Sequence, residues 1–240
     1  MLSPFRRRAL LVILALLALS GIIAVVVFNL VGSRFASLSA DYIRRWFNTP
    51  AERPALTNTR VACPGAPFVL PSAGLVGLLW DDPTRPYNLL NPHTGIDIFG
   101  AGQPGEDAVY AAYDGYLTRL PDWVSTVIIR HDDPLQPART IWTYYAHMAS
   151  ATGASFIVAD FPPDTREQFV AQGTLLGYQG EYSPGQPIGL HLHFSIVLGD
   201  PDGGFLNEAR IANTLDPSPY FRMSMNNDAS PVRPLRCWGF

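Results

Sequence analysis

The chain contains 240 residues, of which only 15% are charged, and its formal net charge is −3 at pH 7. A chain of this length suits one domain of good size with appended segments. Its seventeen basic residues are all arginine, and neither their number nor the net charge indicates the basic surface that nucleic-acid binding requires. We therefore expect no nucleic-acid partner, and the composition leaves the oligomeric state open.

The N-terminal segment differs in kind from the rest of the chain. Three arginines at positions 6–8 precede an uncharged apolar run over residues 9–28. As a helix, such a run spans about 30 Å, which matches the hydrocarbon core of a bilayer, whereas the apolar region of a cleaved secretory signal has about 7 to 15 residues. The sequence therefore predicts a signal-anchor transmembrane helix over residues 9–31. A cleaved signal is the alternative, because the stretch 38–40 ends in a small residue.

The charge pattern also predicts an orientation. Since positive residues favour the cytoplasmic side of a membrane, residues 1–8 are expected in the cytoplasm. The rest of this single-pass protein then faces the periplasm or cell wall. Residues 32–60 predict a juxtamembrane stalk or linker, although "SRFASLSADYIRRWF" within it has near-helical spacing and could continue the helix or lie on the membrane surface. The folded domain is expected over residues 61–240.

Two cysteines lie near the two ends of this expected domain. Cys63 is close to its start and Cys237 is close to its end. In an exported protein these thiols can oxidise, so the sequence favours a disulfide between them. Two free or separately buried thiols are the alternative.

Beyond residue 61 the sequence alternates short apolar runs with turn signals. Asp114-Gly115 separates two such runs and predicts a β-hairpin, while residues 164–172 could form one or two helical turns. The predicted fold class is all-β, with a mostly antiparallel, sandwich-like sheet and long loops. The predicted strands include "AVYAAY", "YLTRL", "STVIIRH", "TIWTYYAH", "GTLLGYQG" and "LHLHFSIV".

Three short motifs contain residues that could bind a metal. In "PHTGIDIFG", His93 precedes Asp97 by four positions, and residues four apart in a strand face the same side. In "HLHF", the period of two places His191 and His193 on one face and the apolar residues on the other.

His147 ends the third motif, "YYAH". Together the motifs supply four imidazoles and one carboxylate, which suit zinc, because catalytic zinc sites use such ligands and keep one position open for water. From the residues alone, histidines satisfied by hydrogen bonds in a core are the alternative. The remaining histidine, His131, is expected to be structural.

The three motifs, in this order and on β-strands, resemble the lysostaphin-type zinc metallopeptidases, also called LytM-like or β-lytic metallopeptidases. The resemblance covers about residues 87–221 and extends to "VYAAYDGYL", "TVIIRH", "GTLLGYQG" and "LDPSPYF". It implies one zinc ion, with three ligands: His93, Asp97 and His193. It also implies three catalytic residues: His147 and His191, which stay uncoordinated and handle protons, and Tyr87, which steadies the oxyanion.

The resemblance implies a membrane-anchored zinc endopeptidase that hydrolyses amide bonds in the peptides of peptidoglycan with a metal-activated water. A non-catalytic module that binds the cell wall or activates other hydrolases is the main alternative, although such relatives usually lack part of the ligand set. A hydrolase of another secreted peptide is a third. The chain departs from the family pattern at Ser195, where glutamate is frequent and where the support of the ligands is therefore expected to differ. The loops after Asp97 and His147 are longer than in the family, and because loops at the rim of a groove contact the substrate, they are expected to affect substrate choice.

Overall fold

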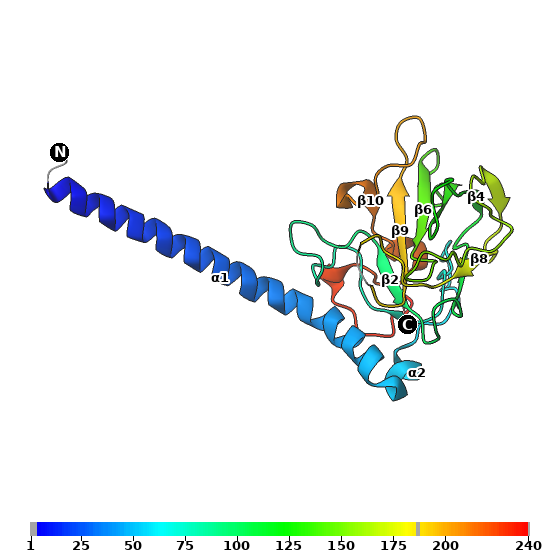
Figure 1. The fold of residues 1–240 in the computed structure, drawn as a ribbon, viewed down its shortest axis with the longest axis horizontal. Helices are drawn as coiled ribbons and strands as arrows, with labels where there is room; N and C mark the ends of the chain where they lie inside the picture. Colours follow the sequence, from blue (N-terminus) through cyan, green and yellow to red (C-terminus); the bar gives the residue numbers. More distant parts are fainter. Residues whose placement is uncertain (1–3, 186–187, 240) are drawn as a thin grey trace.

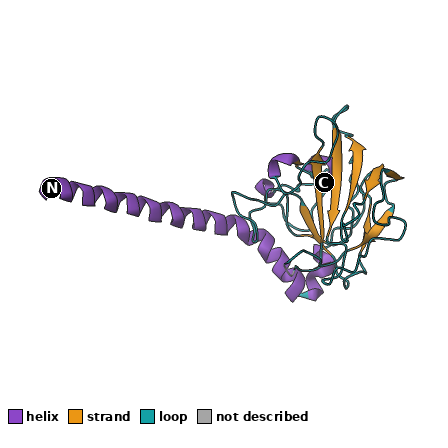
Figure 2. Cartoon of the chain, turned by 45° about the horizontal axis from the view of Figure 1, so that its top comes forward, coloured by secondary structure: helices purple, strands orange, loops and turns teal. Residues whose placement is uncertain are grey.

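An antiparallel β-sheet forms the body of the protein, and one long helix extends from it (Figures 1 and 2). The computed structural model describes residues 4–185 and 188–239. The main sheet has the order β1-β2-β9-β6-β5-β4-β7, β10 also pairs with β9, and β3 pairs with β8 in a second sheet. All these pairs are antiparallel, so the predicted all-β fold is confirmed.

The boundaries of the elements are as follows. The strands are β1 (Leu75–Val76), β2 (Ile96–Phe99), β3 (Ala108–Tyr110), β4 (Gly115–Thr118), β5 (Val127–Asp132), β6 (Thr140–Ala146), β7 (Gln168–Val170), β8 (Leu175–Tyr178), β9 (Leu192–Leu198) and β10 (Thr214–Leu215). The helices are α1 (Pro4–Asn48), α2 (Arg53–Leu56) and α3 (Ser218–Phe221), with 3-10 turns at η1 (Pro50–Glu52), η2 (Ile211–Asn213) and η3 (Asn227–Ala229).

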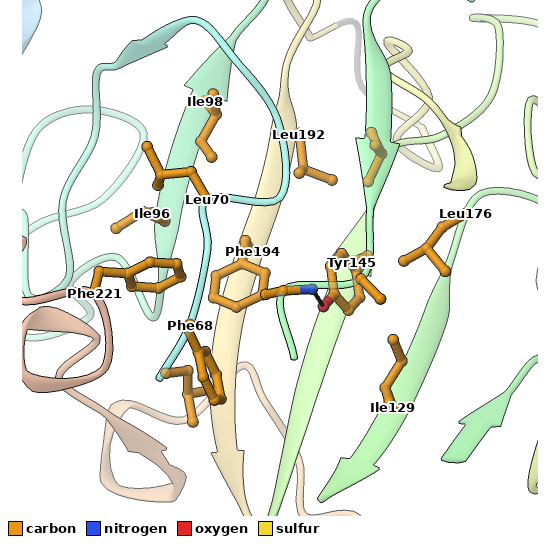
Figure 3. Close-up of a cluster of buried hydrophobic side chains, with 14 of the residues drawn as sticks. Phe68, Leu70, Ile96, Ile98, Ile129, Tyr145, Leu176, Leu192, Phe194 and Phe221 are labelled. Carbon is orange, nitrogen blue, oxygen red and sulfur yellow. Dashed lines mark hydrogen bonds between the residues drawn. The ribbon is translucent and has the colours of Figure 1, made fainter. Parts of the chain in front are cut away.

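Strand β9 separates the core of the protein from its polar face. Leu192, Phe194 and Ile196 are fully buried in the main hydrophobic cluster, and Figure 3 shows Phe194 among side chains from neighbouring strands. One of these is Tyr145 of β6, whose ring centroid lies 5.2 Å from that of Phe194 and whose hydroxyl accepts a hydrogen bond from the backbone of Ala112. Because strand residues alternate, the intervening residues of β9 face away from this core.

The predicted hairpin at Asp114-Gly115 is wrong. Strand β3 pairs with β8 and β4 pairs with β5 and β7, so the turn carries the chain from one sheet to the other. Glycine is needed here for a close approach, since a Cβ on Gly115 would lie 2.4 Å from the carbonyl oxygen of Arg130. The helical turns considered for residues 164–172 are also absent, because the segment contains β7.

Helix α1 covers the segment predicted to cross the membrane. Within the described part of the chain, however, no helix combines the length and apolarity that a membrane crossing requires. The predicted transmembrane helix over residues 9–31 is therefore not confirmed. The prediction for residues 1–8 falls partly on residues 1–3, which lie outside the described residues.

The C-terminal end of α1 packs against the sheet, although it belongs to the segment 32–60 that the sequence predicts as a stalk or linker. Trp46 is fully buried in a cluster with Leu75 and Phe99, and its indole nitrogen donates a hydrogen bond of 3.1 Å to the carbonyl of Gly100. The hydrophobic effect thus fixes this end of the helix to β1 and β2.

A disulfide joins the beginning and the end of the domain, as the sequence favours. Cys63 and Cys237 are bonded, with their Cα atoms 5.4 Å apart, and no cysteine is free. The bond holds the C-terminal segment on the same core cluster as Phe68 and Leu70.

Candidate metal centre

Three side chains from β2, β9 and the loop before β2 converge beside the sheet. Asp97 and His193 lie directly opposite each other in the β2–β9 pairing. Nε2 of His93 lies 2.9 Å from Nδ1 of His193 and 3.1 Å from Oδ1 of Asp97, and that carboxylate oxygen lies 3.0 Å from Nδ1 of His193. All three residues are buried. The structure therefore brings together the three residues that the sequence analysis names as ligands.

The backbone sets the orientation of His93. Its Nδ1–H donates to the carbonyl of Leu79 at 2.9 Å, and its backbone N–H donates to the carbonyl of Asp82 at 3.0 Å. The lone pair of Nε2 therefore points toward the other two ligands. Gly95 permits this approach, because a Cβ there would lie 2.2 Å from the carbonyl oxygen of Phe194.

The arrangement of these donors fits a tetrahedral metal ion. Zinc binds nitrogen and oxygen ligands at about 2.0–2.2 Å, which places tetrahedral ligand atoms roughly 3.3–3.6 Å apart. The three donor atoms, separated by 2.9–3.1 Å, are close to this spacing. Two neutral imidazoles and one carboxylate are also a donor set that zinc prefers.

Two further histidines, His147 and His191, stand beside the ligands. Their ring centroids are 4.7 Å apart, and Nε2 of His191 lies 3.6 Å from Oδ2 of Asp97. Each imidazole donates its Nδ1–H to a backbone carbonyl, that of Tyr182 at 2.7 Å for His147 and that of Gly189 at 2.6 Å for His191. Both rings consequently present a free Nε2 lone pair, which can accept a proton.

His147 occupies this position at a conformational cost. It follows β6 directly and has φ = 72°, in the left-handed region that residues other than glycine seldom adopt. Such a conformation costs about 1–3 kcal/mol and is typical of functional positions.

The electrostatics of the site keep the imidazoles of His147 and His191 neutral and the carboxylate of Asp97 charged. Burial, reinforced by the neighbouring imidazoles of His191 and His193, lowers the pKa of His147 to about 3. Burial also lowers the pKa of His191, against the attraction of Asp97. Burial opposes ionisation of Asp97, but its attraction to the adjacent His93 outweighs this and holds its pKa well below the usual value. In return, and against burial, Asp97 raises the pKa of His93. At neutral pH the site therefore contains a carboxylate and two free bases.

Tyr87, expected from the resemblance to steady the oxyanion, lies beside His93, one of the three expected ligands. Its ring centroid is 4.7 Å from that of His93. Burial, together with the carboxylates of Asp97 and Glu208, raises its pKa. Its hydroxyl therefore stays protonated at neutral pH and can donate a hydrogen bond.

A cavity of about 230 Å³ opens beside these residues. Tyr144 and Glu208 both line it, and neither is among the functional residues expected from the sequence. Tyr144 could have been found, since it shares a face of β6 with Ala146, the partner of His193 in the β6–β9 pairing. Glu208 lies in a loop without motif or periodicity, so no sequence signal indicates it. The cavity is lined by Tyr87, Asn91, Pro92, Thr94, Tyr144, Ala146, His147, His193, Glu208 and Ala209.

His131 is held away from this site. Its Nδ1 lies 2.7 Å from the carbonyl oxygen of Asp114 and its Nε2 lies 2.8 Å from the hydroxyl oxygen of Thr143. Burial lowers its pKa to about 4. These hydrogen bonds fit the structural role that we expect for it.

The departure from the family pattern at Ser195 has a counterpart in the structure. Among the described residues, Nε2 of His193 and the hydroxyl of Ser195 are buried without a hydrogen-bond partner. Metal-binding imidazoles usually donate their outer N–H to a carboxylate, carbonyl or water. No described side chain gives His193 that support.

Comparisons with solved structures return peptidases of the lysostaphin type. The chain is similar to the antimicrobial peptidase lysostaphin from Staphylococcus simulans (18% identity, TM-score 0.36), covering 54% of this chain and 43% of that one. The catalytic domain of lysostaphin matches at 16% identity and a TM-score of 0.37, covering 54% of this chain and 79% of that domain. The prophage-encoded M23 protein EnpA from Enterococcus faecalis, as a mutant catalytic domain, matches at 23% identity and a TM-score of 0.35, covering 64% and 98%.

These likenesses carry no argument about chemistry, because identities and TM-scores are low throughout. This chain spans less than half of the lysostaphin chain that it matches. No protein-family model matches the sequence, and neither does any curated protein.

Proposed function

We propose that this protein is a zinc-dependent peptidase that hydrolyses amide bonds in the peptides of peptidoglycan. The observation that carries the proposal is the convergence of His93, Asp97 and His193 next to two further imidazoles, those of His147 and His191, which donate at Nδ1 and keep a lone pair at Nε2. A buried histidine without a chemical task is normally satisfied at both ring nitrogens, as His131 is here. The imidazoles of His147 and His191 are therefore better explained as proton-accepting bases than as side chains that only fill the core.

Each residue would have a distinct role. A zinc ion held by the three ligands would supply Lewis-acid polarisation and an acidified water. His147 and His191 would take a proton at Nε2 and return it to the leaving amine, because each donates its Nδ1–H to a backbone carbonyl and keeps a lone pair at Nε2. Tyr87 would donate its hydroxyl hydrogen to the developing oxyanion.

Substrate and location are proposed from the sequence. Peptidoglycan peptides are the substrate that the family resemblance implies. The arginines at positions 6–8 and the apolar run over residues 9–28 support a protein anchored at the cytoplasmic membrane with its domain outside. Fractionation of cells, followed by protease treatment of intact and lysed cells, tests this. Recovery of the full chain in the soluble fraction would contradict it.

The activity is tested with the purified full chain. Metal content is measured by elemental analysis, and release of peptides from cell-wall sacculi is followed by chromatography. We expect about one zinc per chain and release that His147→Ala abolishes, while Val232→Ala, an exposed control, behaves as wild type. His93→Ala should lose the metal.

Two outcomes would count against this reading. A wild type that holds zinc but releases nothing beyond His147→Ala would favour a non-catalytic cell-wall module. Zinc content unaffected by His93→Ala would refute the ligand assignment.

A further inference from the structure

Among the described residues that line the cavity beside the proposed metal ligands, Glu208 is the one carboxylate. The remaining side chains of the lining are neutral or are imidazoles. No described residue gives Glu208 a hydrogen bond or an ion pair, although its carboxylate acts electrostatically on two tyrosines, Tyr87 and Tyr144. An unpaired, partly buried carboxylate in a cleft is a recognition element for a cation.

The loop that carries Glu208 is held in place on both sides. Before it, the ring of Phe205 stacks on that of Tyr144, with centroids 6.0 Å apart and planes 18° from parallel. Around it, the side-chain oxygen of Asn207 accepts a hydrogen bond of 3.0 Å from the backbone of Ala209, and the Asn207 carbonyl accepts one of 2.8 Å from the side chain of Asn213. A fixed loop presents the carboxylate at low entropic cost, which favours recognition.

The cavity combines two kinds of polar group. His193 and His147 mark the place where an amide would be attacked, and Glu208 and the two tyrosines line the same cavity. The tyrosines can only donate or accept hydrogen bonds, because burial raises the pKa of Tyr144 to about 12 and raises that of Tyr87 as well. Among the described residues of the lining, Glu208 therefore supplies the formal negative charge.

We infer that Glu208 forms a subsite for a primary ammonium group of the substrate, next to the amide that is cut. This inference rests on the proposed peptidase function and narrows its substrate to peptides with a free amine near the scissile bond. A lysine-type side chain or a free peptide N-terminus has this chemistry. A carboxylate in this position would also disfavour peptides that carry a negative charge there.

The test uses two peptides, Ac-Ala-Ala-Lys-Ala-Ala-NH2 and the same peptide with an Nε-acetylated lysine. Binding to the full-length protein is measured by calorimetry for wild type, Glu208→Gln and Asp202→Asn. Asp202 is an exposed acidic residue of the same loop and serves as the matched control. We expect the ammonium peptide to bind wild type about tenfold more tightly than the acetylated one, a typical effect of one charge pair.

In Glu208→Gln this preference should vanish, whereas Asp202→Asn should keep it. Folding is not at risk, since Glu208 has no hydrogen bond or ion pair in the described structure, and unchanged thermal unfolding verifies this. Equal affinity of wild type for the two peptides, or no measurable binding of the ammonium peptide, overturns the inference. An equal loss of binding affinity for both peptides in Glu208→Gln also overturns the inference.

Hydrolysis is measured separately on sacculi whose free amines are intact or acetylated. If binding shows the ammonium preference but no sacculus is cut, the proposed activity fails and the subsite stands. If both sacculi are cut equally while binding shows no preference, the activity stands and the subsite fails. The expected result is faster cleavage of the intact sacculi by wild type and equal rates for Glu208→Gln.

Discussion

Removing the disulfide should strongly destabilise the domain, and its long loop allows the size of the effect to be worked out. Cys63 and Cys237 are separated by 174 positions, so the bond constrains most of the unfolded chain. In the chain-entropy model the loss of closure entropy for such a loop corresponds to about 5 kcal/mol at 25 °C. The double variant Cys63→Ala/Cys237→Ala should lose this amount of unfolding free energy.

Urea unfolding at neutral pH measures the change. With a slope of about 2–3 kcal/mol per molar urea, the midpoint should fall by about 2 M. Wild type treated with a reductant should show a similar fall, which serves as the control for effects of the substitutions themselves. A fall of less than about 0.5 M would refute the entropic reasoning, because it would mean that the unfolded chain stays compact without the bond.

Three other outcomes are expected. His147→Ala should lower the rate of peptide release by about 10²–10⁴-fold with unchanged zinc content, since it removes a base and not a ligand. Trp46→Ala should lower the unfolding free energy by about 3–5 kcal/mol, because it empties a fully buried site, whereas Arg44→Ala, at an exposed position, should leave it unchanged. Equal urea midpoints for Trp46→Ala and wild type would show that the end of α1 does not unfold together with the domain. Because burial lowers the pKa of His131 to about 4, only the unfolded state takes up this proton between about pH 6.5 and pH 4, so acidification should cost stability there. That pH dependence, measured as urea midpoints at pH 7 and pH 4.5, should be weaker in His131→Asn.

Much of the sheet could be predicted because alternation is a local property. The period of two in "LHLHFSIV" places His191 and His193 on one face of β9 and Leu192 and Phe194 on the core face, as the structure shows. The pairing of Asp97 with His193, which the structure adds, then places the carboxylate on the same face as these histidines.

Which distant strands pair with each other could not be predicted from this alternation. Asp114-Gly115 has the composition of a hairpin turn, yet its glycine is needed for contact with β5. Residues 168–170 pair with β4, and this long-range contact overrides the weak helical pattern around them. Trp46 looks like part of a linker because its burial depends on Leu75 and Phe99, which are far away in the sequence.

The candidate site shows why histidine motifs alone underdetermine chemistry. His93, His147 and His191 each direct Nε2 inward only because a backbone carbonyl takes the proton on Nδ1. Those carbonyls belong to Leu79, Tyr182 and Gly189, and any residue type can supply a carbonyl, so no sequence motif records them. The course of three loops therefore decides which ring nitrogen of each imidazole carries the proton, and His147 takes its position with a left-handed backbone. If the proposed function holds, substitutions that move these loops should consequently impair peptide release even when every proposed ligand and every histidine is retained.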